Sequence, residues 1–132
     1  MAHHRDAALA VNVLGGYGAR GKSDAEANKI VRDARTLASA GAFAIVVEGV
    51  LEPIAEAVTG AVTCPTIGIG ASARCDGQVL VTDDMVGMFE RVPRFVKRYD
   101  DLAARISAAA EAYAGEVRAR TFPGEEQTYR AR

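Results

Sequence analysis

The chain has 132 residues, of which 49% are hydrophobic and 25% are charged, so it has enough apolar side chain to form the core of one compact domain. Its 16 Lys and Arg residues nearly balance 17 Asp and Glu residues, and the net charge of −1 excludes a strongly basic nucleic-acid surface. No apolar run could span a bilayer and no apolar signal core is present at the start, so we expect a cytoplasmic protein that binds neither nucleic acid nor membrane. The two cysteines, Cys64 and Cys75, are too few for a disulfide scaffold, and we expect both to pack as small apolar side chains.

The first ten residues show no clear periodicity, and a glycine-rich loop follows. Ser23 followed by Glu26 is typical of a capping box, so we predict a helix that begins there and ends at Gly41. The apolar run 42–47 predicts a strand that is buried on both faces and ends at Glu48.

Pro53 suits the first turn of a second helix, and the run 65–70 is typical of another buried strand. A strand, a helix and a strand over about 30 residues predict a βαβ unit with parallel strands. Residues 78–81 predict a further short strand.

Apolar residues at helical spacing continue over 89–99, where Pro93 interrupts them. A last long helix is expected over about 100–119, with apolar residues on one face. The tail that follows is polar.

Residues 16–23, with the sequence GYGARGKS, match the phosphate-binding P-loop pattern, in which Lys22 and Ser23 would serve phosphate and Mg²⁺. The alternative is a glycine-rich turn that leads into a helix capped by Ser23. Short motifs match by chance, and no strand that ends in Asp lies at a suitable later position. We therefore favour the turn over a small nucleotide-binding module.

Glu48 ends an apolar strand and precedes Gly49, at the edge of a parallel sheet where ligands bind in α/β proteins. A carboxylate among apolar groups can act as a general base, and the alternative is an exposed glutamate that begins a loop. Gly68 and Gly70 either allow a ligand to approach the backbone closely or mark a tightly packed bend.

Six blocks of the sequence resemble, in order and spacing, the C-terminal half of ketopantoate hydroxymethyltransferase. The blocks are VNVLGGY (11–17), AGAFAIVVE (40–48), PTIGIGA (65–71), CDGQVLV (75–81), DMVGMF (84–89) and FVKRY (95–99). The resemblance covers residues 11–126.

This resemblance implies an α/β fold of the (β/α)₈ TIM-barrel family and an enzyme of pantothenate and coenzyme A synthesis. Such enzymes transfer a hydroxymethyl group from 5,10-methylenetetrahydrofolate to the keto acid 3-methyl-2-oxobutanoate, giving 2-dehydropantoate. A Mg²⁺ ion chelates the keto acid, and a glutamate, matched here by Glu48, removes its β-proton. His3 agrees with a family position, and we expect it near the substrate together with Gly68 and Gly70.

A whole barrel needs about 250 residues, so the chain corresponds to about half of one. The family's metal ligands and its substrate-contacting Ser and Lys lie in the other, N-terminal half. We expect an unpatterned segment 1–10, a half-barrel with a final helix at 11–120 and a polar tail at 121–132. Catalysis would require the missing half from another chain. As macromolecular partner we expect either further copies of this chain or a complementing N-terminal half. The alternative is a non-catalytic remnant that only associates with barrel proteins.

Overall fold

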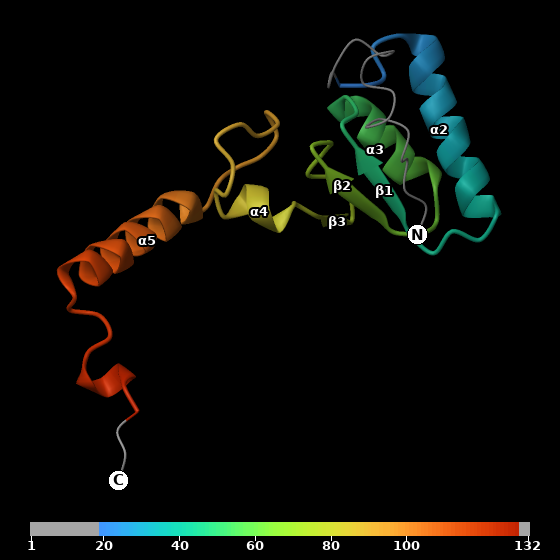
Figure 1. Ribbon diagram of the computed structural model, residues 1–132. Coiled ribbons are helices and arrows are strands. Elements are labelled where there is room, and N and C mark those ends of the chain that lie inside the picture. Colours follow the sequence, from blue (N-terminus) through green and yellow to red (C-terminus); the bar gives the residue numbers. More distant parts are fainter. Residues whose placement is uncertain (1–18, 130–132) are drawn as a thin grey trace. The chain divides into compact units, whose positions relative to one another are not determined.

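The computed structural model describes residues 19–129 and shows α-helices together with a parallel β-sheet (Figure 1). The chain divides into two compact units, residues 1–80 and 81–132. The described strands lie in the first unit, and the second consists of helices and turns. Within the described residues, no helix combines the length and the apolar character needed to cross a membrane.

Helix α2, Asp24–Ser39, begins where the sequence predicts. Ser23 is its N-cap, and the Ser23 hydroxyl accepts a hydrogen bond from the backbone N–H of Glu26 at 3.3 Å. In a capping box the Glu26 side chain would accept a bond from the Ser23 amide. Here its carboxylate instead accepts bonds from two amides that precede the cap. Gly41 follows the helix with a φ of +92°, a conformation that favours glycine, and this explains why the helix ends there.

The predicted βαβ unit is confirmed. Strand β1 (Ile45–Glu48), helix α3 (Glu52–Ala61) and strand β2 (Thr66–Ile69) follow one another, and the two strands are parallel. Strand β3 (Gly77–Gln78) pairs with β2, also in parallel, so the strand order is β1-β2-β3. Pro53 lies in the first turn of α3, where its missing N–H costs no helical hydrogen bond.

Three details of the predicted strands are wrong. The run 42–47 enters the sheet only at Ile45, and the Phe43 side chain before it is 71% exposed. Burial on both faces is also not observed, because Val46 is only half-buried while its neighbours on either side are buried. The third strand is shorter than the predicted 78–81, since the pairing with β2 ends at Gln78.

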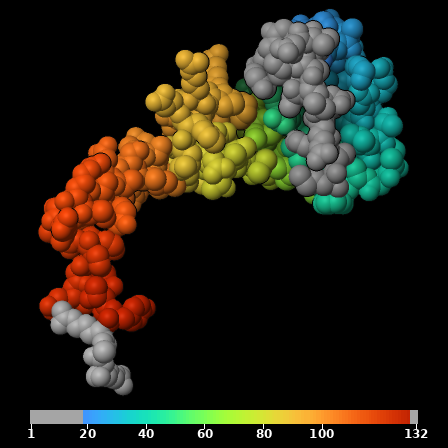
Figure 2. Space-filling view, viewed as in Figure 1, coloured from blue at the N-terminus to red at the C-terminus, as the bar shows by residue number. Residues whose placement is uncertain are grey.

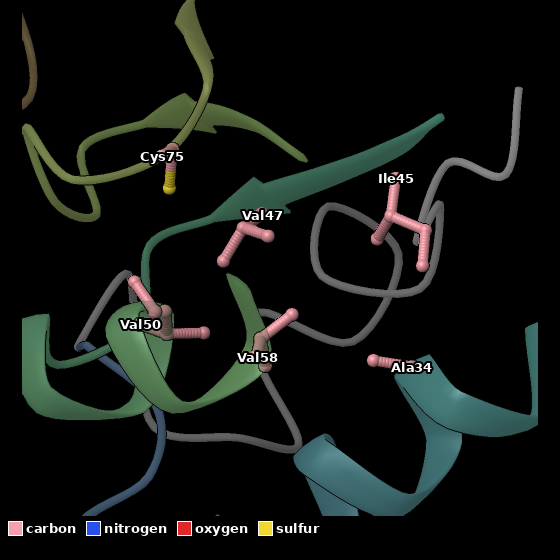
Figure 3. Close-up of a cluster of buried hydrophobic side chains, with 7 residues drawn as sticks. Ala34, Ile45, Val47, Val50, Val58 and Cys75 are labelled. Atoms are coloured by element: carbon pink, nitrogen blue, oxygen red, sulfur yellow. The ribbon is translucent and has the colours of Figure 1, made fainter. Parts of the chain in front are cut away.

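The core of the first unit lies between the sheet and helices α2 and α3. Ala34 of α2, Val58 of α3, and Ile45 and Val47 of β1 converge there (Figure 3). The buried cluster consists of Ala34, Ile45, Val47, Val50, Ala55, Val58 and Cys75. Cys64 packs against this cluster, so both cysteines behave as the small apolar residues that we expect.

The second unit begins with a short helix α4, Thr82–Met85, that the sequence analysis does not predict. The helical spacing over 89–99 does not produce a helix, and this segment forms turns and irregular backbone. Pro93 has no backbone N–H and restricts the residue before it, which explains why apolar spacing alone is not sufficient here.

Helix α5, Leu102–Ala119, agrees closely with the predicted range 100–119. Asp101 is its N-cap, and Arg120 ends it in the left-handed region with a φ of 57°. None of the eighteen residues of α5 (orange in Figure 2) is buried. Its apolar stripe therefore stays partly exposed. A short 3₁₀ turn, Glu125–Gln127, follows in the predicted polar tail.

Candidate functional site

Strands β1 and β2 end at the same level of the sheet. Glu48, the last residue of β1, pairs with Ile69, the last residue of β2. Each is followed by a glycine in the left-handed region, Gly49 with a φ of 59° and Gly70 with a φ of 60°. Because this conformation is costly for residues that carry a Cβ atom, the glycines explain how the chain leaves the sheet at one edge. This carboxyl edge brings together two of the sequence-predicted site residues, Glu48 and Gly70.

The two faces of the sheet have different surroundings. Side chains alternate along a strand, and Ile45 and Val47 point toward α2 and α3 (Figure 3). Glu48 therefore lies on the opposite face. The paired residues of β1 and β2 on that face are half-buried apolar side chains and one exposed carboxylate: Val46 with Ile67, and Glu48 with Ile69.

The Glu48 side chain is exposed, and its carboxylate forms no hydrogen bond or ion pair with another residue of the described range 19–129. A carboxylate with free oxygens at the carboxyl edge of a parallel sheet can accept a proton from a bound ligand. The arrangement thus fits the general base that we expect from the sequence. The exposure agrees equally with the alternative, a glutamate that begins a loop, so the general base stays a prediction.

Gly68 lies inside β2, on the face toward the helices. A Cβ atom placed there would lie 2.9 Å from the Gln78 Oε1 atom and 3.2 Å from the Cys75 Sγ atom. Close packing therefore explains why residue 68 is a glycine, and the positive φ explains why residue 70 is one. Contact of either glycine with a substrate stays a prediction, and His3 lies outside the described residues.

The loop before α2 contains the second half of the P-loop match. The backbone amides of Gly21 and Lys22 donate hydrogen bonds to Glu26 Oε2 at 3.0 and 3.1 Å, and Arg20 Nε lies 2.6 Å from Glu26 Oε1. These bonds, above all the one from the Gly21 amide, hold the pKa of Glu26 below its ordinary value of 4.5.

A P-loop would turn such amides toward a phosphate group. Here a carboxylate of the same chain already accepts them, and Ser23 caps the helix. Among the described residues of the motif, the glycine-rich turn is therefore the correct interpretation. The earlier part of the motif, 16–18, lies outside the described residues.

Sequence reasoning missed a hydrogen-bond network at the opposite, amino end of β2. Asp76 Oδ2 accepts bonds from the Thr66 amide at 2.8 Å and from the Thr66 hydroxyl at 2.9 Å. The Thr59 hydroxyl lies 3.0 Å from the same Thr66 hydroxyl. The adjacent residues Asp76 and Gly77 predict only a turn, so no local signal in the sequence reveals this contact with a residue ten positions earlier.

No group of three or more His, Cys, Asp or Glu side chains within residues 19–129 is arranged to hold a metal ion. The described residues therefore do not by themselves fit a magnesium site.

A parallel sheet with helices packed on it makes the first unit an α/β structure, a class in which ligands commonly bind at the carboxyl edge of the sheet. Comparison with protein families identifies the member of this class. Residues 1–125 match the family described as ketopantoate hydroxymethyltransferase, and the chain belongs to that family.

Several curated relatives have the name 3-methyl-2-oxobutanoate hydroxymethyltransferase. The chain is 79% identical to the protein of that name from Novosphingobium aromaticivorans over 120 residues, which cover 91% of this chain and 42% of the relative. It is 63% identical to the one from Rhodospirillum centenum over 93% of this chain and 45% of the relative. It is 57% identical to the one from Brucella canis, again over 45% of the relative. The chain thus spans somewhat less than half the length of these relatives.

Proposed function

We propose that this chain provides the C-terminal half of a (β/α)₈ barrel that transfers a hydroxymethyl group to 3-methyl-2-oxobutanoate, giving 2-dehydropantoate. The family match and the names of relatives at 57–79% identity support this proposal. They favour it over a nucleotide-binding module, as do the amides of the glycine loop that bind Glu26.

One observation of the structure carries the proposal. Glu48 lies at the carboxyl end of β1 and on the sheet face away from α2 and α3. In (β/α)₈ barrels the helices cover the outer face, the other face lines the barrel interior, and active sites lie at the carboxyl ends of the strands. The position of Glu48 is therefore one that a catalytic residue of a barrel would take.

In the proposed reaction Glu48 is the general base. Its carboxylate removes a proton from the β-carbon of the keto acid, and the carbanion that results attacks the one-carbon donor. The base must lie within hydrogen-bond reach of that proton, and no side chain or amide among residues 19–129 occupies the Glu48 oxygens. The apolar neighbours Val46, Ile67 and Ile69 would restrict water around the reacting carbon.

The other expected components are part of the same proposal. The one-carbon donor is 5,10-methylenetetrahydrofolate. His3, Gly68 and Gly70 lie near the keto acid. The Mg²⁺ ligands are expected in the N-terminal half, as the resemblance to the family implies; residues 19–129 show no such group of ligands.

A complementation experiment tests the proposal. The chain is assayed alone and then together with the N-terminal half of a relative, for tetrahydrofolate-dependent formation of 2-dehydropantoate. We expect no measurable product from the chain alone and product from the pair, because the chain covers only 42–45% of its relatives. A pair that assembles, as sedimentation would show, but forms no product would contradict the proposal and favour a non-catalytic remnant.

A further inference from the structure

The Glu26 carboxylate receives three donors from one short loop. The amides of Gly21 and Lys22 bind one of its oxygens, and the Arg20 guanidinium binds the other. Glu26 itself lies in the first turn of α2, and its side chain is 27% exposed. The carboxylate therefore ties the loop of residues 20–22 to a helix that belongs to the core.

The same loop is attached to the end of β1. The Arg20 amide donates a hydrogen bond to the Gly49 carbonyl at 2.8 Å, and the Leu51 amide donates one to the Arg20 carbonyl at 2.9 Å. Arg20 and Val50 form a parallel bridge. The loop thus contacts the residues that come directly after Glu48.

These contacts lie at Gly49, where the backbone would otherwise be free to change conformation. Gly49 follows Glu48 with a φ of 59°, and glycine permits many other conformations at little cost. Its amide is bound to the Ile69 carbonyl of β2 at 3.1 Å, and its carbonyl is bound to Arg20. Hydrogen bonds from the neighbouring strand and from the loop therefore fix the backbone conformation of Gly49.

The loop of residues 20–22 is also packed tightly against helix α3. Gly21 is buried with a φ of 91°, and a Cβ atom there would lie 2.8 Å from Cγ1 of Ile54 in α3. The space between the loop and α3 is therefore too small for a side chain at position 21, and movement of the loop away from α2 is opposed by the bonds to Glu26.

From this arrangement we propose that Glu26 is a positioning residue, which fixes the end of β1 through Arg20 and Gly49 and so holds Glu48 in place for catalysis. The catalytic part rests on the function proposed above for Glu48. The positioning part rests on the contacts alone. A displacement of about 1 Å in a catalytic group can lower the rate about a hundredfold, so such a tether has a measurable effect.

Residue-resolved amide hydrogen exchange in the full chain tests the positioning part. In Glu26→Ala we expect the Arg20 and Leu51 amides to exchange about ten times faster, because hydrogen bonds to a charged group are lost nearby. The Ile45 amide, bound to the Pro65 carbonyl at the other end of β1, should change much less. Glu26→Gln keeps one acceptor oxygen but turns an amide group toward Arg20, so its effect should be intermediate.

Asp24→Asn is the matched control. Asp24 is an exposed acidic residue in the same first turn of α2, so its replacement removes the same charge near the same helix end. It should leave the Arg20 and Leu51 amides unchanged relative to Ile45.

The catalytic part is measured in the complemented pair, as exchange of the β-proton of 3-methyl-2-oxobutanoate with solvent. Glu26→Ala should lower kcat about tenfold or more and change KM little, whereas a general loss of folded protein would also accelerate exchange of the Ile45 amide reference. Equal acceleration of all three amides, or a normal kcat despite faster Arg20 and Leu51 exchange, would overturn the proposal. A wild-type pair without any β-proton exchange would contradict the proposed function instead, and the amide measurement would still decide whether Glu26 holds the strand end.

Discussion

Asp76 shows how a single carboxylate can join two strands of this sheet. It accepts hydrogen bonds from the Thr66 amide and hydroxyl, and the Thr66 side chain is completely buried. The bond from the Thr66 amide is the main reason that the pKa of Asp76 lies below its ordinary value of 3.8. The ionised form therefore stabilises the fold fully above about pH 3.8, and this stabilisation is lost as the pH falls through the lower pKa of the folded state.

We predict that Asp76→Asn lowers the melting temperature by a few degrees at pH 7, because the neutral amide is a weaker acceptor for Thr66. The difference from the wild type should become smaller as the pH falls below 3.8, because the unfolded chain then takes up a proton at Asp76, and it should vanish below the lower pKa of the folded state, where the native carboxylate is protonated too. Thermal unfolding followed by circular dichroism at pH 7, 5 and 3 measures both effects. Asp83→Asn, an exposed aspartate in α4, is the control; a difference that stays constant over this pH range would show that the charge of Asp76 is not the cause.

Strand β2 shows how packing between elements limits a single position. Gly68 is in contact with Gln78, whose side-chain amide donates a 2.8 Å hydrogen bond to the Ser72 carbonyl. A methyl group at Gly68 would displace Gln78 and disturb that bond. The 3.2 Å approach to Cys75 leaves little room on the other side, because Cys75 belongs to the core.

For Gly68→Ala we predict a loss of about 1–3 kcal/mol in the free energy of unfolding, as is typical of overpacking. The matched variant is Gly60→Ala in α3, where an added Cβ meets nothing within 4 Å. There the same change should raise stability by about 0.5–1 kcal/mol, since alanine favours the helix. Urea unfolding of both variants gives the two values; a Gly68→Ala chain as stable as the wild type would exclude packing as the reason for this glycine.

The elements that the sequence predicts correctly are those with local signals. Ser23 and Gly41 mark the two ends of α2, and Pro53 marks the start of α3. The apolar runs predict β1 and β2, but the extent of β3 depends on pairing with β2 and has no local pattern of its own. Local spacing also cannot reveal that only one face of the sheet is covered by α2 and α3, which is why burial on both faces was a wrong prediction.

The candidate site also has a part that the sequence predicts and a part that it does not. Glu48 can be predicted because it ends an apolar strand and precedes a glycine, and the structure places it at the carboxyl edge of the sheet. The tether from Glu26 to Arg20 cannot be predicted, because the pattern S-x-x-E assigns Glu26 to its own helix cap. The side chain instead binds the preceding loop, which becomes visible only when that loop is seen beside β1.

At the scale of the whole molecule, the family match covers nearly the full chain, while the chain covers 42–45% of the curated relatives. Val46, Ile67 and Ile69 are half-buried on the sheet face away from α2 and α3, within the described residues. In the proposed barrel this face would be covered by the N-terminal half, which would also enclose Glu48. Catalysis is therefore expected to be a property of the assembled barrel.

The most direct test is deuterium uptake by 3-methyl-2-oxobutanoate in the complemented pair, with Mg²⁺ and without the folate donor. Glu48→Gln keeps the shape of the side chain but cannot accept the proton, so uptake should slow by about 10²- to 10⁴-fold, with little change in the affinity for the keto acid. The control is Glu56→Gln, a change at a half-buried glutamate of α3 that pairs with Arg74, and it should leave uptake unchanged. Uptake by Glu48→Gln within a few-fold of the wild type would contradict the account and would make Glu48 an exposed glutamate that begins a loop.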